Sequence, residues 1–138
     1  MAPLYRLADR LRYRKDHNLG RRGEDLAHRY LRARGFIIAA RNWRPPQGGG
    51  EIDIIAWENA SGQTSLVFIE VKTRSSDAWS PPERAIDAEK MRVLRRAARD
   101  YIRRSGADPA RVRFDAISIT GGKLEHFREA FTWDLSLY

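Results

Sequence analysis

The sequence predicts an α/β fold in which a mixed β-sheet is flanked by helices. Two segments, residues 19–34 and 81–104, carry apolar side chains at helical spacing. Short runs of apolar and β-branched residues, bounded by turn residues, lie between and after these segments. The resulting element order is α-β-β-β-α-β, followed by one more β-strand. A chain of 138 residues is the size of one domain, so we expect a single core.

The two expected helices are marked by glycine and proline. The first covers about residues 19–34, and Gly35 is well placed to end it. Gly20 and Gly23 are poor helix formers, so their position in the first turns indicates close approach of another backbone or of a ligand. The second helix opens at a proline pair and covers about residues 81–104.

Five strands are expected, at about residues 36–42, 51–57, 66–73, 111–120 and 123–127. A loop with two prolines and three consecutive glycines, residues 45–50, precedes the second strand. The polar, turn-rich segment 58–65 joins the second strand to the third, so these two strands form a hairpin. Asp115 interrupts the fourth strand, and we expect it to have a structural role such as pairing with an arginine.

The chain is strongly basic, with 26 lysine and arginine residues against 18 acidic residues and a net charge of +8. Residues 1–22 hold seven basic residues and two acidic ones. We therefore expect a basic N-terminal arm over residues 1–17, followed by a single domain over residues 18–138. This charge suits a polyanionic partner, because each phosphate contact releases counterions. The alternative is that the charge serves solubility alone.

The composition excludes several kinds of chemistry. The chain has no cysteine, which rules out disulfides, thiol catalysis and cysteine-ligated zinc or iron–sulfur centres. The three histidines show no ligand spacing, and no glycine-rich phosphate loop of the nucleotide-binding type is present. No apolar run approaches the ~20 residues of a membrane span, and no signal-peptide pattern is visible. We expect a cytoplasmic protein without membrane contact.

The predicted hairpin carries the side chains that point to function. Successive side chains on a strand point to opposite faces of a sheet. If Trp57 pairs with Leu66 across the turn, the antiparallel register is defined. Asp53 then lies directly opposite Glu70, with β-carbons ~4.5–5.5 Å apart. Lys72 stands two residues beyond Glu70 on the same face. A slip of one residue would place the two acids on opposite faces.

Two facing carboxylates within apolar strands repel each other, and burying them without partners is costly. A divalent cation would resolve this conflict. Mg²⁺ is commonly held by one or two carboxylates together with phosphate oxygens and waters, and Mn²⁺ suits similar ligands. The cation can activate a bound water, and Lys72 could orient the nucleophile or stabilise the transition state. The alternative is a solvated face, with Lys72 in a surface salt bridge of little energetic value.

Charged residues on the two expected helices are further candidates. Glu24 sits at the edge of the first helix's apolar stripe, where it could supply another carboxylate or hold a metal-bound water. It equally fits an acid favoured by the helix dipole. Lys90 lies within the second helix's apolar stripe and must either snorkel or meet an anion. The candidate nucleic-acid contacts are Lys90, Arg74, Arg21 and Arg22.

Two of these segments resemble a known family. Gly-Glu-Ile-Asp-Ile-Ile (Gly50–Ile55) and Phe-Ile-Glu-Val-Lys-Thr-Arg (Phe68–Arg74) resemble the YraN family of small bacterial proteins. The similarity covers roughly residues 18–132, and its further matches are Gly20–Glu24, Ala27, Lys90, Arg113–Asp115 and Ala130-Phe131. That family is similar to the PD-(D/E)xK nuclease superfamily, especially to archaeal Holliday junction resolvases.

The resemblance implies a restriction-endonuclease-like fold and a nuclease site. It implies metal ligands at Asp53 and Glu70, a catalytic lysine at Lys72 and an assisting acid at Glu24. Ile52 stands where the superfamily name would place proline, and this departure leaves Asp53 in place.

We therefore expect a Mg²⁺- or Mn²⁺-dependent endonuclease that hydrolyses phosphodiester bonds in DNA, with branched or junction structures as candidate substrates. One alternative is a nucleic-acid-binding module that retains the fold without catalysis. Another is an adaptor in a DNA-processing complex. A homodimer would suit symmetric cutting of a junction.

Overall fold

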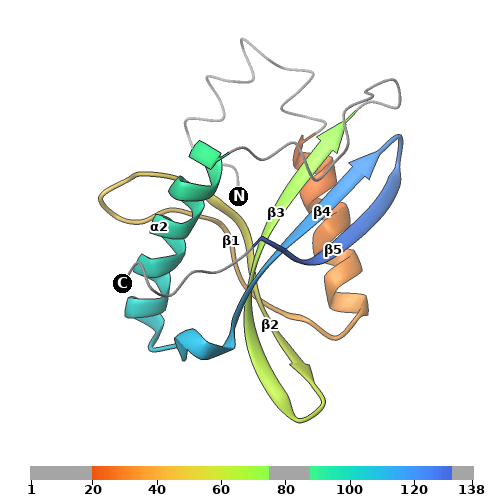
Figure 1. The fold of residues 1–138 in the computed structure, drawn as a ribbon. Helices are drawn as coiled ribbons and strands as arrows, with labels where there is room; N and C mark the ends of the chain where they lie inside the picture. The colour runs from red at the N-terminus through yellow and green to blue at the C-terminus, as the bar shows by residue number, and fades with distance from the viewer. Residues whose placement is uncertain (1–19, 75–87, 132–138) are drawn as a thin grey trace.

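The computed structural model describes residues 20–74 and 88–131. Within these residues, a helix over residues 20–33 precedes the sheet, and α2 (Ala88–Ser105) and a short 3-10 helix (Pro109–Arg111) interrupt the strands. The strands are β1 (Ile37–Trp43), β2 (Ile52–Ala60), β3 (Gln63–Arg74), β4 (Val112–Thr120) and β5 (Lys123–Phe131). They form one sheet in the order β1-β2-β3-β4-β5 (Figure 1). The predicted α/β class and α-β-β-β-α-β order are confirmed.

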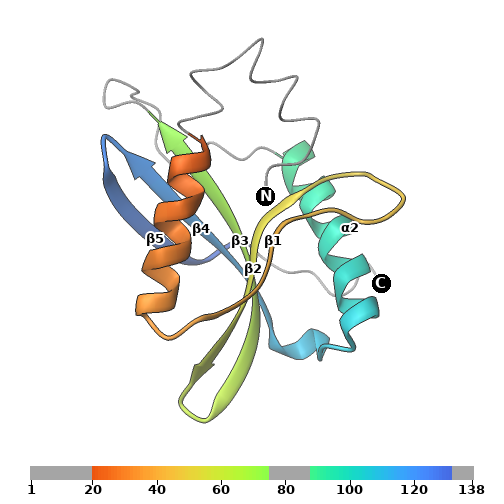
Figure 2. The same cartoon turned by 180° about the vertical axis from the view of Figure 1, so that it is seen from behind.

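The sheet is mixed, as expected. β3 and β4 are parallel, whereas the other three neighbouring pairs are antiparallel. A parallel pair needs a crossover connection, and the segment that contains α2 supplies it. The helix over residues 20–33 and α2 cover opposite faces of the sheet, which is clearest when both views are compared (Figures 1 and 2). Neither helix is long and apolar enough to span a membrane.

Each face of the sheet has its own apolar core. The face under α2 is closed by buried side chains of the helix and of the central strands, among them Met91, Leu94, Ala98, Ile102, Ile55, Phe68 and Phe114. The opposite face is closed by Ala27, Leu31, Ile54, Val67, Ile69, Ile117 and Ile119. β2 and β3 contribute to both cores, because their side chains alternate between the two faces. A charged group in the middle of these strands therefore needs a specific partner.

The hairpin has the predicted register but a shorter turn. Trp57 pairs with Leu66, as expected, and the ladder runs from Ala60–Gln63 to Ile54–Ile69. The polar segment 58–65 was expected to be a loop, yet most of it continues the two strands. Only Ser61 and Gly62 turn, with φ of 54° and 75°. Two successive residues with positive φ give a tight hairpin turn whose twist matches that of the strands.

The ends of the other elements agree only in part with those predicted from the sequence. The first helix ends as predicted, because Gly35 adopts a φ of 90° and its N–H bonds to the Arg32 carbonyl at 3.0 Å. The last strand reaches Phe131 instead of ending at residue 127, and its pairing with β4 contains an irregularity. The predicted arm over residues 1–17 and the predicted start of the second helix lie outside the described residues.

Asp115 on β4 is the centre of a buried polar network. Its carboxylate is fully buried and accepts hydrogen bonds from the Arg113 guanidinium at 2.8 and 3.0 Å. His126 Nε2 donates to it at 2.8 Å, and the Glu129 N–H donates at 3.0 Å. The Tyr30 hydroxyl lies 3.1 Å from Nδ1 of His126, so the network reaches the first helix. The expected structural pairing of Asp115 with an arginine is confirmed.

This network sets the charge state of Asp115. Burial alone would raise the pKa of the carboxyl, but the hydrogen bonds from His126, Arg113 and the Glu129 amide outweigh burial and lower it. The group therefore contributes stability that is present above the ordinary carboxyl pKa. That contribution is lost as the pH falls through the lowered folded-state pKa.

We expect Asp115→Asn to reduce the free energy of unfolding by about 3 kcal/mol near neutral pH, because the partly buried Arg113 guanidinium loses its ionised acceptor. The difference from wild type should begin to narrow below about pH 4, where the carboxyl of the unfolded chain becomes protonated, and it should close as the pH falls through the lowered folded-state pKa. Chemical denaturation over a pH series measures both effects.

Asp108→Asn is the matched control for this substitution. Asp108 is an exposed cap of the 3-10 helix, and asparagine caps equally well, so its stability should stay near that of wild type. Equal stability of the Asp115→Asn and Asp108→Asn variants would contradict the role assigned to the buried network.

Candidate active site

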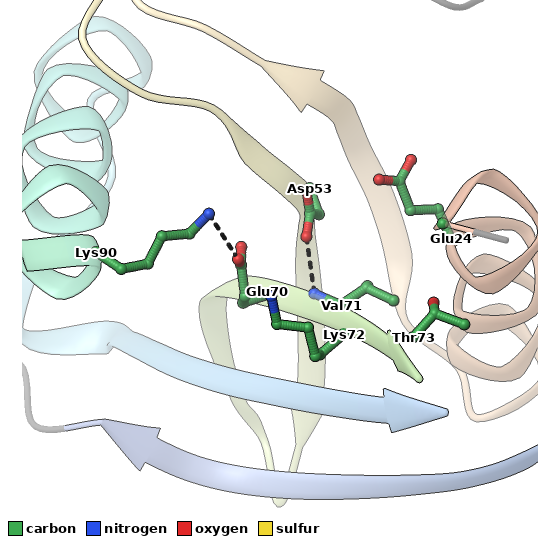
Figure 3. A pocket seen from close by; sticks show the side chains of 8 residues that line it. Glu24, Asp53, Glu70, Val71, Lys72, Thr73 and Lys90 are labelled. Atoms are coloured by element: carbon green, nitrogen blue, oxygen red, sulfur yellow. Dashed lines mark hydrogen bonds and ion pairs between the residues drawn. The ribbon is translucent and has the colours of Figure 1, made fainter. Parts of the chain in front are cut away.

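A pocket with a cavity volume of about 300 Å³ opens at the end of the β2–β3 ladder (Figure 3). It lies between the first helix and α2, so both helices and β2 and β3 contribute to its wall. It is lined by Gly20, Glu24, Asp53, Glu70, Val71, Lys72, Thr73 and Lys90. All four residues predicted to be catalytic are thus brought together in one place, and Lys90 joins them.

Asp53 and Glu70 meet where β2 and β3 stop pairing. The ladder ends at the pair Ile54–Ile69, and the same register continued by one residue puts Asp53 opposite Glu70. Asp53 Oδ2 accepts a hydrogen bond from the Val71 N–H at 2.8 Å. The Val71 N–H lies beyond the end of the ladder and donates to the Asp53 side chain. This hydrogen bond holds the Asp53 carboxylate toward β3.

Glu70 is the acid that β3 contributes to the pocket wall. Its side chain is 6% exposed, and Oε2 lies 3.1 Å from the Nζ of Lys90. Oε1 is buried and has no hydrogen-bond partner among the described residues. A buried carboxylate oxygen without a donor is energetically costly. The site therefore contains an oxygen that a bound cation or a donor from a ligand could satisfy.

The acids of the pocket perturb one another. Burial raises the pKa of Asp53 well above its ordinary value, and the negative charges of Glu70 and Glu24 raise it further. The hydrogen bond from the Val71 amide acts in the opposite direction but does not compensate. Without a cation, the pocket thus favours a proton on Asp53.

Two lysines face these acids from different elements. Lys72 follows Glu70 by two residues on β3, so it shares the face of the sheet on which Glu70 lies. Lys90 comes from the first turn of α2 as described and reaches toward Glu70 (Figure 3). Burial lowers the pKa of Lys90, but the charge of Glu70 and the hydrogen bond to its carboxylate outweigh burial and raise it. Lys90 is therefore a cation in the pocket.

The first helix reaches the pocket because of Gly23. A β-carbon at Gly23 would lie 2.0 Å from Oγ1 of Thr73, so only glycine allows the helix this close to β3. Glu24 follows directly and is 6% exposed. The predicted close approach is found at Gly23, but the neighbour is the Thr73 side chain and not a backbone or a ligand. A β-carbon at Gly20 would meet nothing within 4 Å, and Gly20 lines the pocket instead.

Glu24 is held by β1. The Asn42 side-chain amide donates to Oε1 of Glu24 at 3.1 Å, and the Arg41 guanidinium lies 3.7 Å from the same oxygen. Asn42 has a φ of 51°, an unusual backbone conformation that asparagine tolerates. Glu24 consequently faces the pocket from the side opposite Lys90 (Figure 3).

A second glycine fixes β2 against α2. Gly50 has a φ of 120°, and a β-carbon there would lie 2.5 Å from Cγ1 of Val93. The backbone that leads into Asp53 is therefore packed tightly on the helix that carries Lys90. This contact sets the spacing between the acid of β2 and the lysine of α2.

The four residues expected to contact nucleic acid differ in their position relative to the pocket. Arg21 and Arg22 are exposed and follow pocket-lining Gly20, while Arg74 ends β3 two residues after Lys72. None of these three arginines lines the pocket, whereas Lys90 lies inside it.

Sequence reasoning missed the groups that orient the acids. The Val71 N–H is a backbone donor, and no sequence pattern shows that it meets a side chain. Arg41 and Asn42 lie at the end of β1, and a polar pair after an apolar strand was the only available signal. The sequence did indicate that Lys90, as a lysine in an apolar stripe, could meet an anion, and Glu70 is that anion.

The donor set fits a hard divalent cation. Asp53 and Glu70 provide carboxylate oxygens, and Oε1 of Glu70 lacks a partner among the described residues. Within residues 20–74 and 88–131, no group of three histidine, cysteine or carboxylate side chains forms a complete ligand cluster. Two carboxylates are nevertheless a common protein contribution to Mg²⁺, because waters and substrate phosphate oxygens complete its coordination.

Residues 23–119 match the family described as Uncharacterised protein family UPF0102. The chain belongs to the UPF0102 family. The predicted membership of the YraN family is thereby confirmed, since the two names describe the same family. The matched residues span every acid and lysine of the pocket.

Several UPF0102 proteins are similar over most of their length. One from Solibacter usitatus (strain Ellin6076) is 53% identical over 132 residues, which cover 93% of this chain and 97% of that protein. A relative from Desulfosudis oleivorans is 40% identical over 119 residues, with coverage of 85% and 92%. A third, UPF0102 protein RHA1_ro06551 from Rhodococcus jostii (strain RHA1), is 43% identical over 122 residues, with coverage of 83% and 98%.

The raised pKa of Asp53 leads to a stability prediction for this UPF0102 protein. A carboxyl with a raised folded-state pKa destabilises the fold as the pH rises from the ordinary pKa through the raised one. We expect Asp53→Asn to raise the melting temperature by about 3–5 °C at pH 8 in EDTA. Asparagine can still accept the Val71 N–H, so the variant removes charge while retaining that hydrogen bond.

The gain should shrink as the pH falls and disappear near about pH 3, below the ordinary carboxyl pKa, where Asp53 is protonated in both the folded and the unfolded chain. Thermal melts at both pH values measure the difference, with Asp108→Asn as the control for the same substitution on the surface. A variant that melts below wild type at pH 8 would mean that Asp53 is not electrostatically frustrated.

Proposed function

We propose that this UPF0102 protein is a metal-dependent nuclease that hydrolyses phosphodiester bonds in DNA, with branched and junction structures as candidate substrates. The observation that supports this most strongly is the meeting of Asp53 and Glu70 at a pocket that two lysines also line. A pure binding module would gain little from clustered carboxylates that face a polyanion. Mg²⁺ or Mn²⁺ is the cofactor under this proposal.

The reaction needs a nucleophile, a stabilised phosphate and two proton movements. Hydrolysis joins a water oxygen to phosphorus and breaks one phosphorus–oxygen ester bond. The water loses a proton, and the departing sugar oxygen gains one. A divalent cation, when bound, supplies a water of lowered pKa and neutralises charge on the phosphate. Asp53 and Glu70 are the residues that would hold it.

Lys72 and Glu24 have the remaining roles in the proposed reaction. Lys72 stabilises the negative charge that develops on the phosphate oxygens, because its ammonium shares the face on which Glu70 lies. Glu24 assists from the opposite wall by accepting a hydrogen bond from the attacking water. Asn42 and Arg41 keep Glu24 in position for that role.

The proposed partner and location follow from charge and composition. A net charge of +8 and the exposed Arg21 and Arg22 beside the pocket support binding to a phosphate backbone. Arg74 and the basic residues 1–17 extend the proposed contact. A homodimer would suit two symmetric cuts in a junction. A chain without cysteine is compatible with the reducing cytoplasm, where we place the activity.

The direct test is cleavage of a labelled panel of single-stranded DNA, duplex, flap, four-way junction and RNA, in Mg²⁺, Mn²⁺ or EDTA. We expect metal-dependent cutting of at least one DNA member. Asp53→Asn and Lys72→Ala should each reduce the rate by at least about 100-fold, because each removes a group that acts on the reacting phosphate. Binding to the same DNA should weaken steeply as salt concentration rises.

Arg104→Ala is the matched control. Arg104 lies at the far end of α2, about 21 Å along the helix from Lys90, and its loss should leave the rate within twofold of wild type. Cutting that persists in EDTA or in the Asp53→Asn variant would contradict the proposed site. Salt-sensitive binding without cutting would favour the non-catalytic binding module, and absence of binding would favour the adaptor.

A further inference from the structure

The ion pair between Lys90 and Glu70 joins a fixed group to a movable one. Glu70 projects from the middle of the sheet, and its side chain is 6% exposed. Lys90 starts from α2, and its side chain is 46% exposed although its Nζ lies 3.1 Å from Oε2 of Glu70. Rotamer changes can turn the half-exposed lysine side chain toward solvent, whereas the Glu70 side chain is enclosed where it stands.

Lys90 compensates the pocket only in part. Lys90 and Lys72 bring two positive charges to the pocket, while its three acids, Glu24, Asp53 and Glu70, can carry three negative ones. The Lys90 ammonium contacts Oε2 of Glu70, and Oε1 remains buried without a hydrogen-bond partner among the described residues. A divalent cation between the two carboxylates would satisfy more of this charge than the lysine does.

A divalent cation and the Lys90 ammonium compete for the same carboxylate. Two cations that share Glu70 would lie within a few ångströms of each other in a pocket that is only partly open to water, where like charges repel strongly. The partner that can withdraw is Lys90, because its side chain is 46% exposed, whereas that of Glu70 is 6% exposed.

We propose that Lys90 is a removable counter-ion of Glu70, which holds the carboxylate while no divalent cation is bound and withdraws when one binds. This inference rests on the proposed metal-dependent function, and it adds a positioning role for Lys90. After withdrawal, the ammonium stands at the mouth of the pocket, where a phosphate group of the substrate would arrive. A phosphate that attracts Lys90 removes the competitor from Glu70, so substrate and cation binding favour each other.

The test is a Mn²⁺-binding titration of the whole chain by calorimetry, at constant pH and ionic strength and without nucleic acid. We expect Lys90→Met to bind Mn²⁺ more tightly than wild type, on the order of tenfold, because a positive charge in contact with a ligand carboxylate is removed. Lys90→Gln should show the same direction. Lys90→Arg retains the charge and should bind nearly as wild type does.

Two further variants separate the local effect from general electrostatics. Arg92→Met removes one exposed charge from the same turn of α2 and should leave the affinity unchanged. The double variant Asp53→Asn/Lys90→Met should lose the gain, which places the bound cation at the two carboxylates. Melting curves in EDTA confirm that each variant is folded.

The outcomes distinguish this inference from the proposed function. If wild type binds Mn²⁺ and Lys90→Met binds it equally or more weakly, Lys90 is not a competitor, and the metal site itself stands. If neither wild type nor Lys90→Met binds Mn²⁺, the metal-dependent function and the counter-ion role both fail.

Discussion

The repulsion between Asp53 and Glu70 is the constraint around which the rest of the pocket is organised. These acids lie where β2 and β3 stop pairing, next to strands that supply both apolar cores. Their positions are imposed by the sheet, so neither can relax away from the other. A hydrogen bond from the Val71 amide and an ion pair from Lys90 offset part of this repulsion, and the pKa of Asp53 is raised. Because these contacts do not remove the repulsion completely, we infer a bound cation.

Close contacts between neighbouring elements hold the pocket residues in their relative positions. Gly23 brings the first helix against Thr73, and Gly50 brings the start of β2 against α2. The buried Asp115 network ties β4 and β5 together and reaches the first helix through Tyr30. The acids therefore project from closely packed elements, whereas the two lysine ammonium groups stand at the ends of flexible side chains. A preorganised set of acids with movable cations suits binding of an ion followed by a phosphate.

Much of this site could be predicted from strand alternation alone. The opposition of Asp53 and Glu70 followed from pairing Trp57 with Leu66, and the register held although the turn is shorter than expected. The reason is that the polar segment 58–65 and the actual turn at Ser61-Gly62 have the same centre. The supports for the acids could not be predicted, because the Val71 amide carries no side-chain signal and the approach of β1 to Glu24 depends on tertiary packing.

The most direct test of the central claim is anomalous diffraction from crystals of the protein soaked in Mn²⁺. The account predicts a manganese peak between the carboxylates of Asp53 and Glu70, with the Lys90 ammonium displaced from Glu70. Absence of a peak there, with Lys90 still paired to Glu70 at a saturating Mn²⁺ concentration, would contradict it. In that case the two acids would be a structural pair neutralised by a proton and a lysine.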